Sequence, residues 1–363
     1  MPRTNVRRTL TVALAGVLVA GLTGCGANEA AGGGSDASVE GAAAAKIALL
    51  LPESKTTRYE AFDRPLFEAK VAELCPDCEV VYSNADQDDA KQLQQAEAAL
   101  TEGVDVMVLD PVDSKAAASI VNSAKSQDVP VIAYDRFIAE APIDYYISFD
   151  NEKVGQLQGQ ALVDKLQADG VTSGNLLMIN GSPTDNNAGL FKAGAHSVLD
   201  QSPYTIAAEF DTPDWSPDEA QAWTEGQLAA STDIVGVYAA NDGTAGGAIA
   251  AMKGAGMDPI PPVTGQDAEL TAIQRIVAGS QFMTVYKAIK PEAEKAAELA
   301  VALANGETPE VDGEVEGIPS VLLEPVAVTV DNIADTIVAD EFYSVEEICT
   351  PEYAEACAAA GLG

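Results

Sequence analysis

The sequence predicts an α/β protein made of two doubly wound lobes, each with a parallel sheet covered by helices. From Lys46 onward, short apolar runs rich in β-branched residues alternate regularly with amphipathic stretches, as in parallel strands joined by helices. The chain has 363 residues, which is enough for two domains with full cores. About ten strands in one sheet would be unusual, so we expect the runs to be divided between two sheets.

The expected strands are short apolar runs spread over both halves of the chain. They cover residues 46–52, 79–83, 104–110, 129–135, 144–150, 174–181, 204–210, 233–242, 261–267 and 281–287. The stretches 88–103 and 151–170 carry apolar residues at helical spacing. This alternation of strands and helices predicts parallel sheets covered by helices.

The first segment has the features of a bacterial export signal. Arg3, Arg7 and Arg8 form a basic region, and the apolar run over 10–22 is too short to remain as a membrane helix. The run ends in Leu22-Thr23-Gly24-Cys25, which resembles the lipobox of bacterial lipoproteins, where cleavage precedes a cysteine that carries lipid.

We therefore expect 1–24 to be a signal peptide, Cys25 to be the lipidation site and 25–45 to be a flexible linker. The mature protein would then be extracytoplasmic and anchored to the outer face of the cell membrane by this lipid alone. The alternative is an ordinary secretory signal with a chance cysteine.

The charge balance is strongly acidic, with a formal net charge of -36. Such a surface repels nucleic acid and anionic lipid headgroups, which argues against both as partners. It favours solubility outside a cell. No stretch carries oxygen ligands at calcium-loop spacing, and His196 is the one imidazole, so we expect no metal and no cofactor.

Besides Cys25, the chain contains Cys75, Cys78, Cys349 and Cys357, and an even count in an exported protein predicts two disulfides. Four cysteines allow three pairings, of which short loops favour Cys75–Cys78 with Cys349–Cys357. The spacing of Cys75 and Cys78 also fits a redox motif. The motif lies between a helical pattern and a strand instead of opening a helix, which favours a structural disulfide.

Polar side chains follow many of the expected strands, and ligands of open parallel sheets bind beyond the carboxyl ends of the strands. Carboxylates, amides and cations match the donors and acceptors of sugar hydroxyls, and an aromatic face suits the C–H face of a sugar ring. The sequence therefore predicts a site for a neutral polyhydroxyl ligand. Its candidate residues are Arg58, Tyr59, Asp135, Arg136, Asn187, Trp215, Asn241, Asp267 and Lys287.

Structural roles compete with these assignments, because an Asp at the end of a strand is often the N-cap of the next helix. Asp135 and Asp267 have this alternative, and Asp150, Asn151 and Asp242 are better explained by it. The remaining polar and aromatic candidates are expected to be structural: Asn186 in a turn, His196 at the surface, and Phe62, Phe67, Phe191 and Phe282 in the core.

The blocks AYDRFI, DYYISFDNEKVGQLQ, GSPTDNNAGLFKAG, ANDGTAGGAI, TGQDAELTAIQRI and MTVYK resemble those of periplasmic-binding-protein-like sugar binders of ABC importers, most closely the xylose-binding type. The resemblance runs from about Lys46 to about Ile337. It implies a type I periplasmic binding protein fold, with crossovers near Phe149, Lys287 and Leu323. The implied lobes are 46–149 plus 288–322 and 150–287 plus 323–363.

The resemblance also implies a role for each candidate. Asp135, Arg136, Asn187, Asn241, Asp267 and Lys287 would contact the ligand, Trp215 would stack on the sugar, and Arg58 and Tyr59 would lie at the edge of the first lobe. Tyr59 stands where the family commonly has Trp. The implied protein is a monomeric solute-binding lipoprotein that captures a monosaccharide, D-xylose or another pentose or hexose, for an ABC permease, without catalysis.

Other functions fit the sequence less well. A sensor subunit that presents the sugar to a membrane receptor would have the same fold, so this alternative stays open. A glycosidase would need paired carboxylates, but the candidates here alternate with Arg, Asn and Lys, and the sequence has no nucleophile elbow or phosphate loop. A sugar-binding repressor would need a helix-turn-helix and a basic surface.

Overall fold

The structure, a computed structural model, describes residues 44–230 and 233–363. The expected signal peptide, Cys25 and all but the last residues of the expected linker lie outside this part of the chain. The described residues belong to one compact unit. No helix within the described residues is long and apolar enough to cross a membrane.

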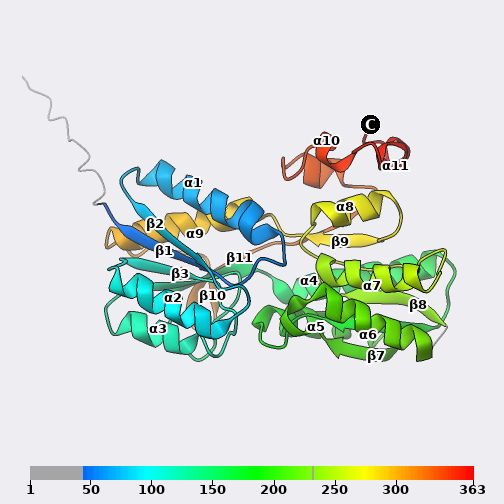
Figure 1. Cartoon of the computed structure of the whole chain (residues 1–363), viewed down its shortest axis with the longest axis horizontal. Helices are drawn as coiled ribbons and strands as arrows, with labels where there is room; N and C mark the ends of the chain where they lie inside the picture. Colours follow the sequence, from blue (N-terminus) through cyan, green and yellow to red (C-terminus); the bar gives the residue numbers. More distant parts are fainter. Residues whose placement is uncertain (1–43, 231–232) are drawn as a thin grey trace, which may run out of the picture. The chain divides into compact units, whose positions relative to one another are not determined.

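The first lobe is built on a seven-stranded sheet with the order β10-β11-β5-β4-β3-β1-β2 (Figure 1). All pairs are parallel except β10 with β11. Its strands are β1 (Lys46–Leu51), β2 (Glu79–Asn84), β3 (Val106–Leu109), β4 (Val131–Tyr134), β5 (Tyr145–Phe149), β10 (Gly313–Val315) and β11 (Ile318–Leu323). Its helices are η1 (Tyr59–Asp63), α1 (Arg64–Leu74), α2 (Asp89–Thr101), α3 (Ala118–Lys125) and α9 (Ile289–Ala304).

Both faces of this sheet are buried, which explains the continuous apolar runs of its strands. Alternate residues of β1 point to opposite faces: Ile47, Leu49 and Leu51 join one core cluster, and Ala48 and Leu50 join another. The first cluster contains residues of α1 and α9 and the second contains residues of α2 and α3, so one helix pair covers each face (Figure 1).

The second lobe has a parallel sheet with the order β7-β6-β8 and an antiparallel pair of β9 and β12. These strands are β6 (Asn175–Asn180), β7 (Thr205–Asp211), β8 (Ile234–Ala239), β9 (Met283–Tyr286) and β12 (Val326–Thr329). The helices are α4 (Asn151–Ala168), α5 (Asn186–Leu199), η2 (Pro213–Trp215), α6 (Pro217–Ala230), α7 (Asp242–Gly254), α8 (Leu270–Val277), η3 (Ala334–Val338), α10 (Val345–Ile348) and α11 (Ala354–Ala359).

The expected strand over 261–267 is not a regular strand. It forms only single parallel bridges, from Val263 to Val237 and from Gln266 to Val285. The physical reason is local, since Pro261 and Pro262 have no N–H with which to extend a hydrogen-bonded ladder. The segment still lies between β8 and β9 and connects the two pieces of the second sheet. Strands β10, β11 and β12 were not expected from the sequence.

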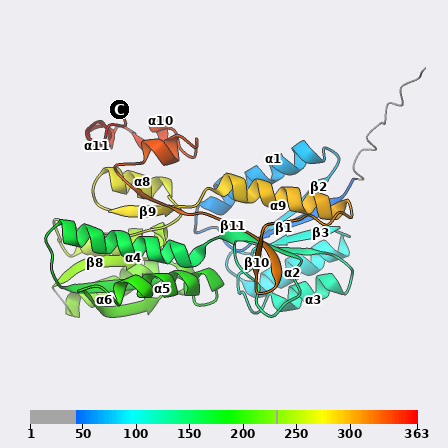
Figure 2. The same cartoon turned by 180° about the vertical axis from the view of Figure 1, so that it is seen from behind.

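Helices α4 and α5 pack closely on one face of the second sheet because glycines form their contact. A Cβ on Gly155 would lie 1.9 Å from the carbonyl oxygen of Phe191, and one on Gly194 would lie 2.0 Å from that of Glu152. Helices α6 and α7 lie on the other face (Figure 1), opposite α4 and α5, which lie in front in Figure 2; their apolar residues join Leu177 and Ile179 of β6. The close packing of α5 fixes the position of its first turn, which carries Asn187.

The chain passes between the lobes three times, between β5 and α4, between β9 and α9, and between β11 and β12. Two of these crossovers are joined directly, since the Asp150 amide donates to the Leu323 carbonyl at 3.0 Å. The predicted fold class, with two parallel-sheet lobes and three crossovers, is confirmed. The residue boundaries of the lobes given above stay a prediction.

Two predictions about helix caps have different outcomes. Asp150 is the N-cap of α4, and its carboxylate accepts from the Lys153 amide. The assignment of Asp242 as a cap is wrong, because Asn241 forms the capping box of α7 with Thr244. Asp242 is the first residue of the helix and is completely buried.

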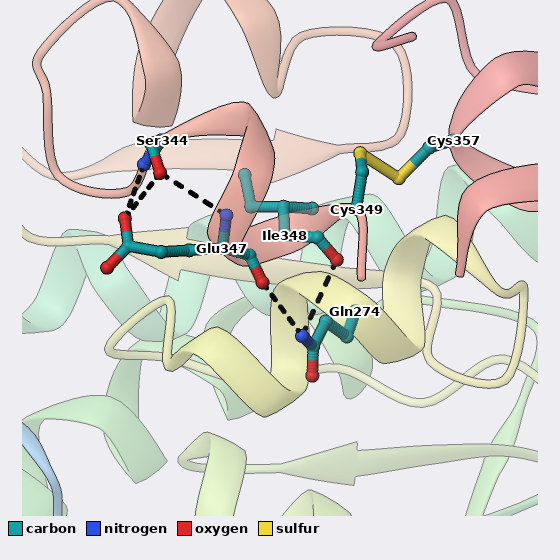
Figure 3. Close-up of a disulfide and its surroundings, with 6 residues drawn as sticks. All are labelled: Gln274, Ser344, Glu347, Ile348, Cys349 and Cys357. Atoms are coloured by element: carbon teal, nitrogen blue, oxygen red, sulfur yellow. Dashed lines mark hydrogen bonds between the residues drawn. A yellow bond between two sulfur atoms is a disulfide. The ribbon is translucent and has the colours of Figure 1, made fainter. Parts of the chain in front are cut away.

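The structure pairs Cys75 with Cys78, between the end of α1 and the start of β2, and Cys349 with Cys357, between α10 and α11. Both pairs are those that short loops favour. The second pair closes the C-terminal segment, which packs on α8 (Figure 3). Both disulfides lie outside the cavity described below.

Candidate ligand-binding site

A small cavity is lined by polar side chains from both lobes. It contains every residue that the sequence singled out as a ligand contact. The lining residues are Thr56, Arg58, Tyr59, Asp135, Arg136, Asp185, Asn187, Phe191, Trp215, Asn241, Gln266, Asp267 and Lys287. The cavity therefore lies where the carboxyl ends of the parallel strands of both lobes meet.

Asp135 lies just after β4 and has a backbone φ of 55°, a left-handed conformation that non-glycine residues rarely adopt. Its carbonyl holds this geometry by accepting from the hydroxyls of Tyr146 and Ser148 and from the Asn187 amide. Asn187 belongs to the second lobe, so one of these bonds crosses the cleft. Backbone strain of this kind, held by surrounding contacts, is typical of functional sites.

Cations surround the Asp135 carboxylate. The Lys287 ammonium donates to it at 3.0 Å, and an Arg58 guanidinium nitrogen lies 3.3 Å away. Burial by itself raises the pKa of Asp135, but Arg58, Lys287 and Arg136 outweigh burial and hold the pKa below its ordinary value. Asp135 is therefore an ionised acceptor at neutral pH.

Arg58 is only 2% exposed and forms ion pairs with two carboxylates besides Asp135. Its guanidinium donates to Asp63 at 2.9 and 2.7 Å and to Glu292 at 2.6 Å. The remaining nitrogen, Nη1, is the one 3.3 Å from Asp135, and it makes no hydrogen bond among the described residues. Because this buried donor lies at the cavity, it is available to a bound ligand.

Arg136 joins the lobes by an ion pair, with Nε 3.0 Å from an Asp185 carboxylate oxygen. Asp110, at the end of β3, lies 3.5 Å from the same nitrogen. The other end of the guanidinium donates to the Tyr59 hydroxyl at 3.1 Å. Arg58 and Tyr59 are both buried at the cavity, deeper than the lobe edge at which the sequence placed them.

Trp215 contributes the large aromatic surface of the cavity. Its backbone φ is 53°, and its indole N–H donates to Asp185 at 3.0 Å. Phe191 supports the ring edge-on, with the ring centres 6.3 Å apart. Gly181 allows this position, because a Cβ there would lie 2.0 Å from the indole.

The second lobe supplies the remaining polar groups of the cavity. Asn241 uses its side-chain oxygen to cap α7, which leaves its amide nitrogen for the cavity. Asp267 has a φ of 95°, and burial raises the pKa of its carboxyl to about 6, against the opposing effect of Lys287 and Arg58. The Gln266 side-chain oxygen is buried without a hydrogen-bond partner among the described residues.

These groups suit a neutral ligand with many hydroxyls. The cations Arg58, Arg136 and Lys287 are already paired with carboxylates, so little net charge is left for a charged ligand to neutralise. Each sugar hydroxyl can donate to a carboxylate or amide oxygen and accept from a guanidinium or ammonium group. Within the part of the chain that the structure describes, no group of His, Cys, Asp and Glu could hold a metal ion.

Sequence reasoning missed several residues of this arrangement. Asp110 ends an expected strand, so the criterion used for Asp135 would also have found it. Asp185 follows the strand over 174–181 but was not selected as a ligand contact. Gln266 directly precedes Asp267 and could have been included with it. Asp63 and Glu292 lie in helical elements and reach the site only through Arg58, so no local pattern marks them. Phe191, expected in the core, belongs to the core and also lines the cavity.

A family model described as a periplasmic binding protein domain matches residues 47–308. The chain belongs to this family. The D-xylose-binding periplasmic protein of Escherichia coli (strain K12) is 40% identical over 312 residues, covering 84% of this chain and 92% of the relative. A multiple sugar-binding periplasmic receptor of Rhizobium radiobacter is 34% identical over 290 residues, covering 72% of this chain and 81% of that protein.

Solved structures of periplasmic binding proteins agree. An ABC transporter solute-binding protein of Clostridium phytofermentans with bound β-D-glucose has a TM-score of 0.76 and 26% identity, covering 84% of this chain and 99% of that one. A carbohydrate transporter solute-binding protein of Chloroflexus aurantiacus in complex with D-glucose has a TM-score of 0.75 and 29% identity, with coverages of 83% and 97%. The chain is thus an extracytoplasmic sugar-binding protein of ABC transport and not an enzyme.

Proposed function

We propose that this periplasmic binding protein captures D-xylose and delivers it to the permease of an ABC importer, as a monomeric lipoprotein held at the outer face of the cell membrane by Cys25. The observation that carries the proposal is the cavity between the lobes. It combines carboxylate and amide groups, buried cationic donors and an indole face around one small space. The arrangement is that of a site for one small polyol.

The lining favours a small polyhydroxyl ligand, because polar groups of both lobes face each other across the cavity. The choice of D-xylose is supported by the names of two relatives, both called D-xylose-binding periplasmic protein, at 40% and 38% identity over 312 residues. The Rhizobium radiobacter relative is named for multiple sugars, and the two structural neighbours hold glucose. The test must therefore distinguish D-xylose from other monosaccharides.

Binding would proceed by closure of the lobes about the three crossovers. Lys287 lies at one crossover, directly after β9, and reaches Asp135 of the first lobe. The sugar would replace solvent between Asp135 with Arg58 on one side and Asn241 with Asp267 on the other. Its free energy of binding would thus favour the closed form, and the permease would receive the sugar from that form.

The direct test is calorimetric titration of the mature protein with matched sugars. D-Xylose and D-glucose share the configuration of their ring hydroxyls and differ by one hydroxymethyl group, whereas L-arabinose differs from D-xylose at one ring hydroxyl. We expect D-xylose to bind more tightly than D-glucose, L-arabinose, D-ribose and D-galactose. Tighter binding of another sugar would replace the xylose claim, and no heat with any of them would contradict sugar capture.

The lipid anchor has its own test. The full chain and the Cys25→Ser variant would be expressed in a bacterium that processes lipoproteins, followed by fractionation and mass spectrometry. The native chain is expected in the membrane fraction with a lipidated Cys25, and the variant is expected in the soluble fraction. A native chain cleaved elsewhere and found without lipid would contradict the anchor without affecting sugar binding.

A further inference from the structure

An aromatic cluster connects the lobes outside the cavity. Phe62, in η1 of the first lobe, stacks on Phe342 with ring centres 4.2 Å apart and an interplanar angle of 19°. It also meets Tyr343 edge-on at 5.6 Å. Phe342 and Tyr343 belong to the C-terminal segment, residues 340–363, which packs on the second lobe. A residue that was expected in the core of one lobe is therefore a contact between two.

The C-terminal segment is tied firmly to the second lobe. Gln274 of α8 donates to the carbonyls of Glu347 and Ile348, and the Cys349–Cys357 disulfide closes the segment beyond them (Figure 3). At its other end, the Tyr343 hydroxyl accepts from the Leu270 amide at the start of α8. These contacts fix the C-terminal segment on α8, and with it the positions of Phe342 and Tyr343.

Both partners of the aromatic contact lie next to residues of the binding site. Phe62 shares the single turn of η1 with Tyr59, and α8 begins three residues after Asp267. A second contact between the lobes lies between them, where Glu269 accepts from the Thr57 amide at 3.3 Å. The aromatic cluster therefore lies close to Arg58 and Tyr59 in the first lobe and to the loop that carries Asp267 in the second.

We infer that Phe342 and Tyr343 are positioning residues for ligand binding, which hold the lobes closed by packing on Phe62. The inference rests on the proposed function, since it concerns the closure that traps the ligand. Neither residue touches the cavity, so each acts on the ligand only through the equilibrium between the open and closed forms. The C-terminal segment with its disulfide is then part of the binding machinery.

Opening the cleft would separate Phe62 from Phe342 and expose both rings, whereas closing would bury them. An aromatic pair of this geometry stabilises a folded contact enough to change an equilibrium about 2- to 12-fold. Since the contact is made after the ligand has entered, its loss is expected in the dissociation rate more than in the association rate.

The test compares Phe62→Ala, Phe342→Ala and the double variant in stopped-flow binding of the sugar found by titration. Each single change should raise the dissociation rate about 2- to 12-fold, and the double change should add little to either, because the two rings form one contact. The matched control is Phe210→Ala, which removes a stacked pair with Trp223 at 5.4 Å inside the second lobe. It should lower thermal stability and leave the dissociation rate unchanged.

A second measurement does not depend on the identity of the sugar. Spin labels at Ala98→Cys on α2 and Ala222→Cys on α6, both exposed, report the distance between the lobes. Phe62→Ala and Phe342→Ala should shift the ligand-free protein toward the longer distance, and Phe210→Ala should not. The Cys349→Ser, Cys357→Ser double variant should act in the same direction as Phe342→Ala.

The outcomes separate the two proposals. If the native protein binds no sugar but the label distances shift as expected, closure by the aromatic cluster stands and the proposed sugar fails. If sugar binds and neither the dissociation rate nor the label distance changes in the Phe62 and Phe342 variants, the positioning role is overturned while the proposed function stands. Additive effects of the two single changes would also overturn it.

Discussion

Asp135 and Asp242 are both buried aspartates that closely follow parallel strands, yet their surroundings differ. Asp135 faces Arg58, Arg136 and Lys287, and although burial opposes them, these cations hold its pKa below the ordinary value. Asp242 accepts from the Gln281 amide, the Thr284 hydroxyl and the Glu269 backbone amide. Burial and the neighbouring Glu269 raise its pKa well above the ordinary value.

The difference shows which strand-end carboxylate serves a ligand. Asp135 contacts groups from both lobes and keeps its charge in a cavity, so it is positioned to accept from a ligand. Asp242 contacts groups of the second lobe alone and joins α7 to β9 and the 266–269 loop. We therefore expect changes at Asp135 to act mainly on affinity and changes at Asp242 to act mainly on folding.

The largest effect should come from Asp135→Asn, which removes the charge opposite Lys287 and Arg58. Lys287 then loses its ion-pair partner, whereas Arg58 keeps Asp63 and Glu292. We expect sugar affinity, measured by calorimetry, to fall about 100-fold, on the scale of a lost charged hydrogen bond. Asp242→Asn should lower the urea-unfolding free energy by about 1–3 kcal/mol through an imperfectly matched amide. Its affinity should fall less than about five-fold, because its partners lie in one lobe.

Similar changes in sugar affinity in Asp135→Asn and Asp242→Asn would contradict this distinction. An Asp135→Asn protein with nearly native affinity would mean that the cations hold the ligand without this carboxylate. An Asp242→Asn protein that loses affinity as strongly would mean that the second-lobe network acts on the cavity through the 266–269 loop.

Trp215→Ala and Asp267→Ala test the second-lobe side of the cavity. Trp215→Ala removes the aromatic face, and Asp267→Ala removes a buried carboxylate that lines the cavity. Each should cost at least about ten-fold in affinity by calorimetry, on the magnitudes of stacking and of a buried hydrogen bond. Unchanged affinity in both variants would place the ligand elsewhere.

Gly181→Ala should have a smaller effect through the same indole. The added methyl group would lie 2.0 Å from the Trp215 ring, so the ring must shift within the cavity. We expect affinity to fall about 2- to 10-fold, since a misplaced ring loses part of its stacking. Gly189→Ala is the control, because nothing lies within 4 Å of its added Cβ. Equal affinities of the two variants would show that the position of the ring is unimportant.

The smallest effect concerns pH and Glu269, which faces Asp267, Arg275, Glu53 and the Thr57 amide. Burial, with Asp267 beside it, raises the pKa of Glu269 to about 7, above its ordinary 4.5. A raised folded-state pKa stabilises the fold at low pH, and this contribution is lost as the pH rises through about 7. Native protein should therefore lose more urea-unfolding free energy than Glu269→Gln between about pH 5 and pH 8.

Asp267 and Glu292 also have raised pKa values, about 6 and about 8, so they add to the pH dependence of the native protein. Both residues are present in Glu269→Gln as well, so the difference between the two pH profiles reports on Glu269 alone. Parallel pH profiles of the two proteins would show that Glu269 keeps its ordinary pKa.

Much of the fold could be predicted from the sequence because burial on both faces makes the central strands continuous apolar runs. Strand β1 and strand β6 are examples, with alternate residues in separate cores. Strands β10 and β12 could not be predicted because they are short and partly exposed, so their sequences show no clear alternation of apolar and polar residues. The prolines at 261 and 262 reduced a predicted strand to single bridges.

The candidate site could be predicted because its residues follow strands, where a parallel sheet brings distant segments together. The left-handed backbone of Asp135, Trp215 and Asp267 could not be predicted, since it depends on contacts with other segments. The same is true of Glu292, which is far from Arg58 in sequence and is marked by no motif. Pairwise contacts across the fold decide these features, and local patterns do not contain them.

The central claim is that one sugar occupies the cavity between the lobes, held from both sides. The most direct test is a crystal structure of the mature protein grown with D-xylose. It should show the sugar ring against Trp215, with hydroxyls in hydrogen-bond reach of Asp135, Asn241 and Asp267. A sugar bound outside this cavity, or a closed cavity left empty at saturating xylose, would contradict the account.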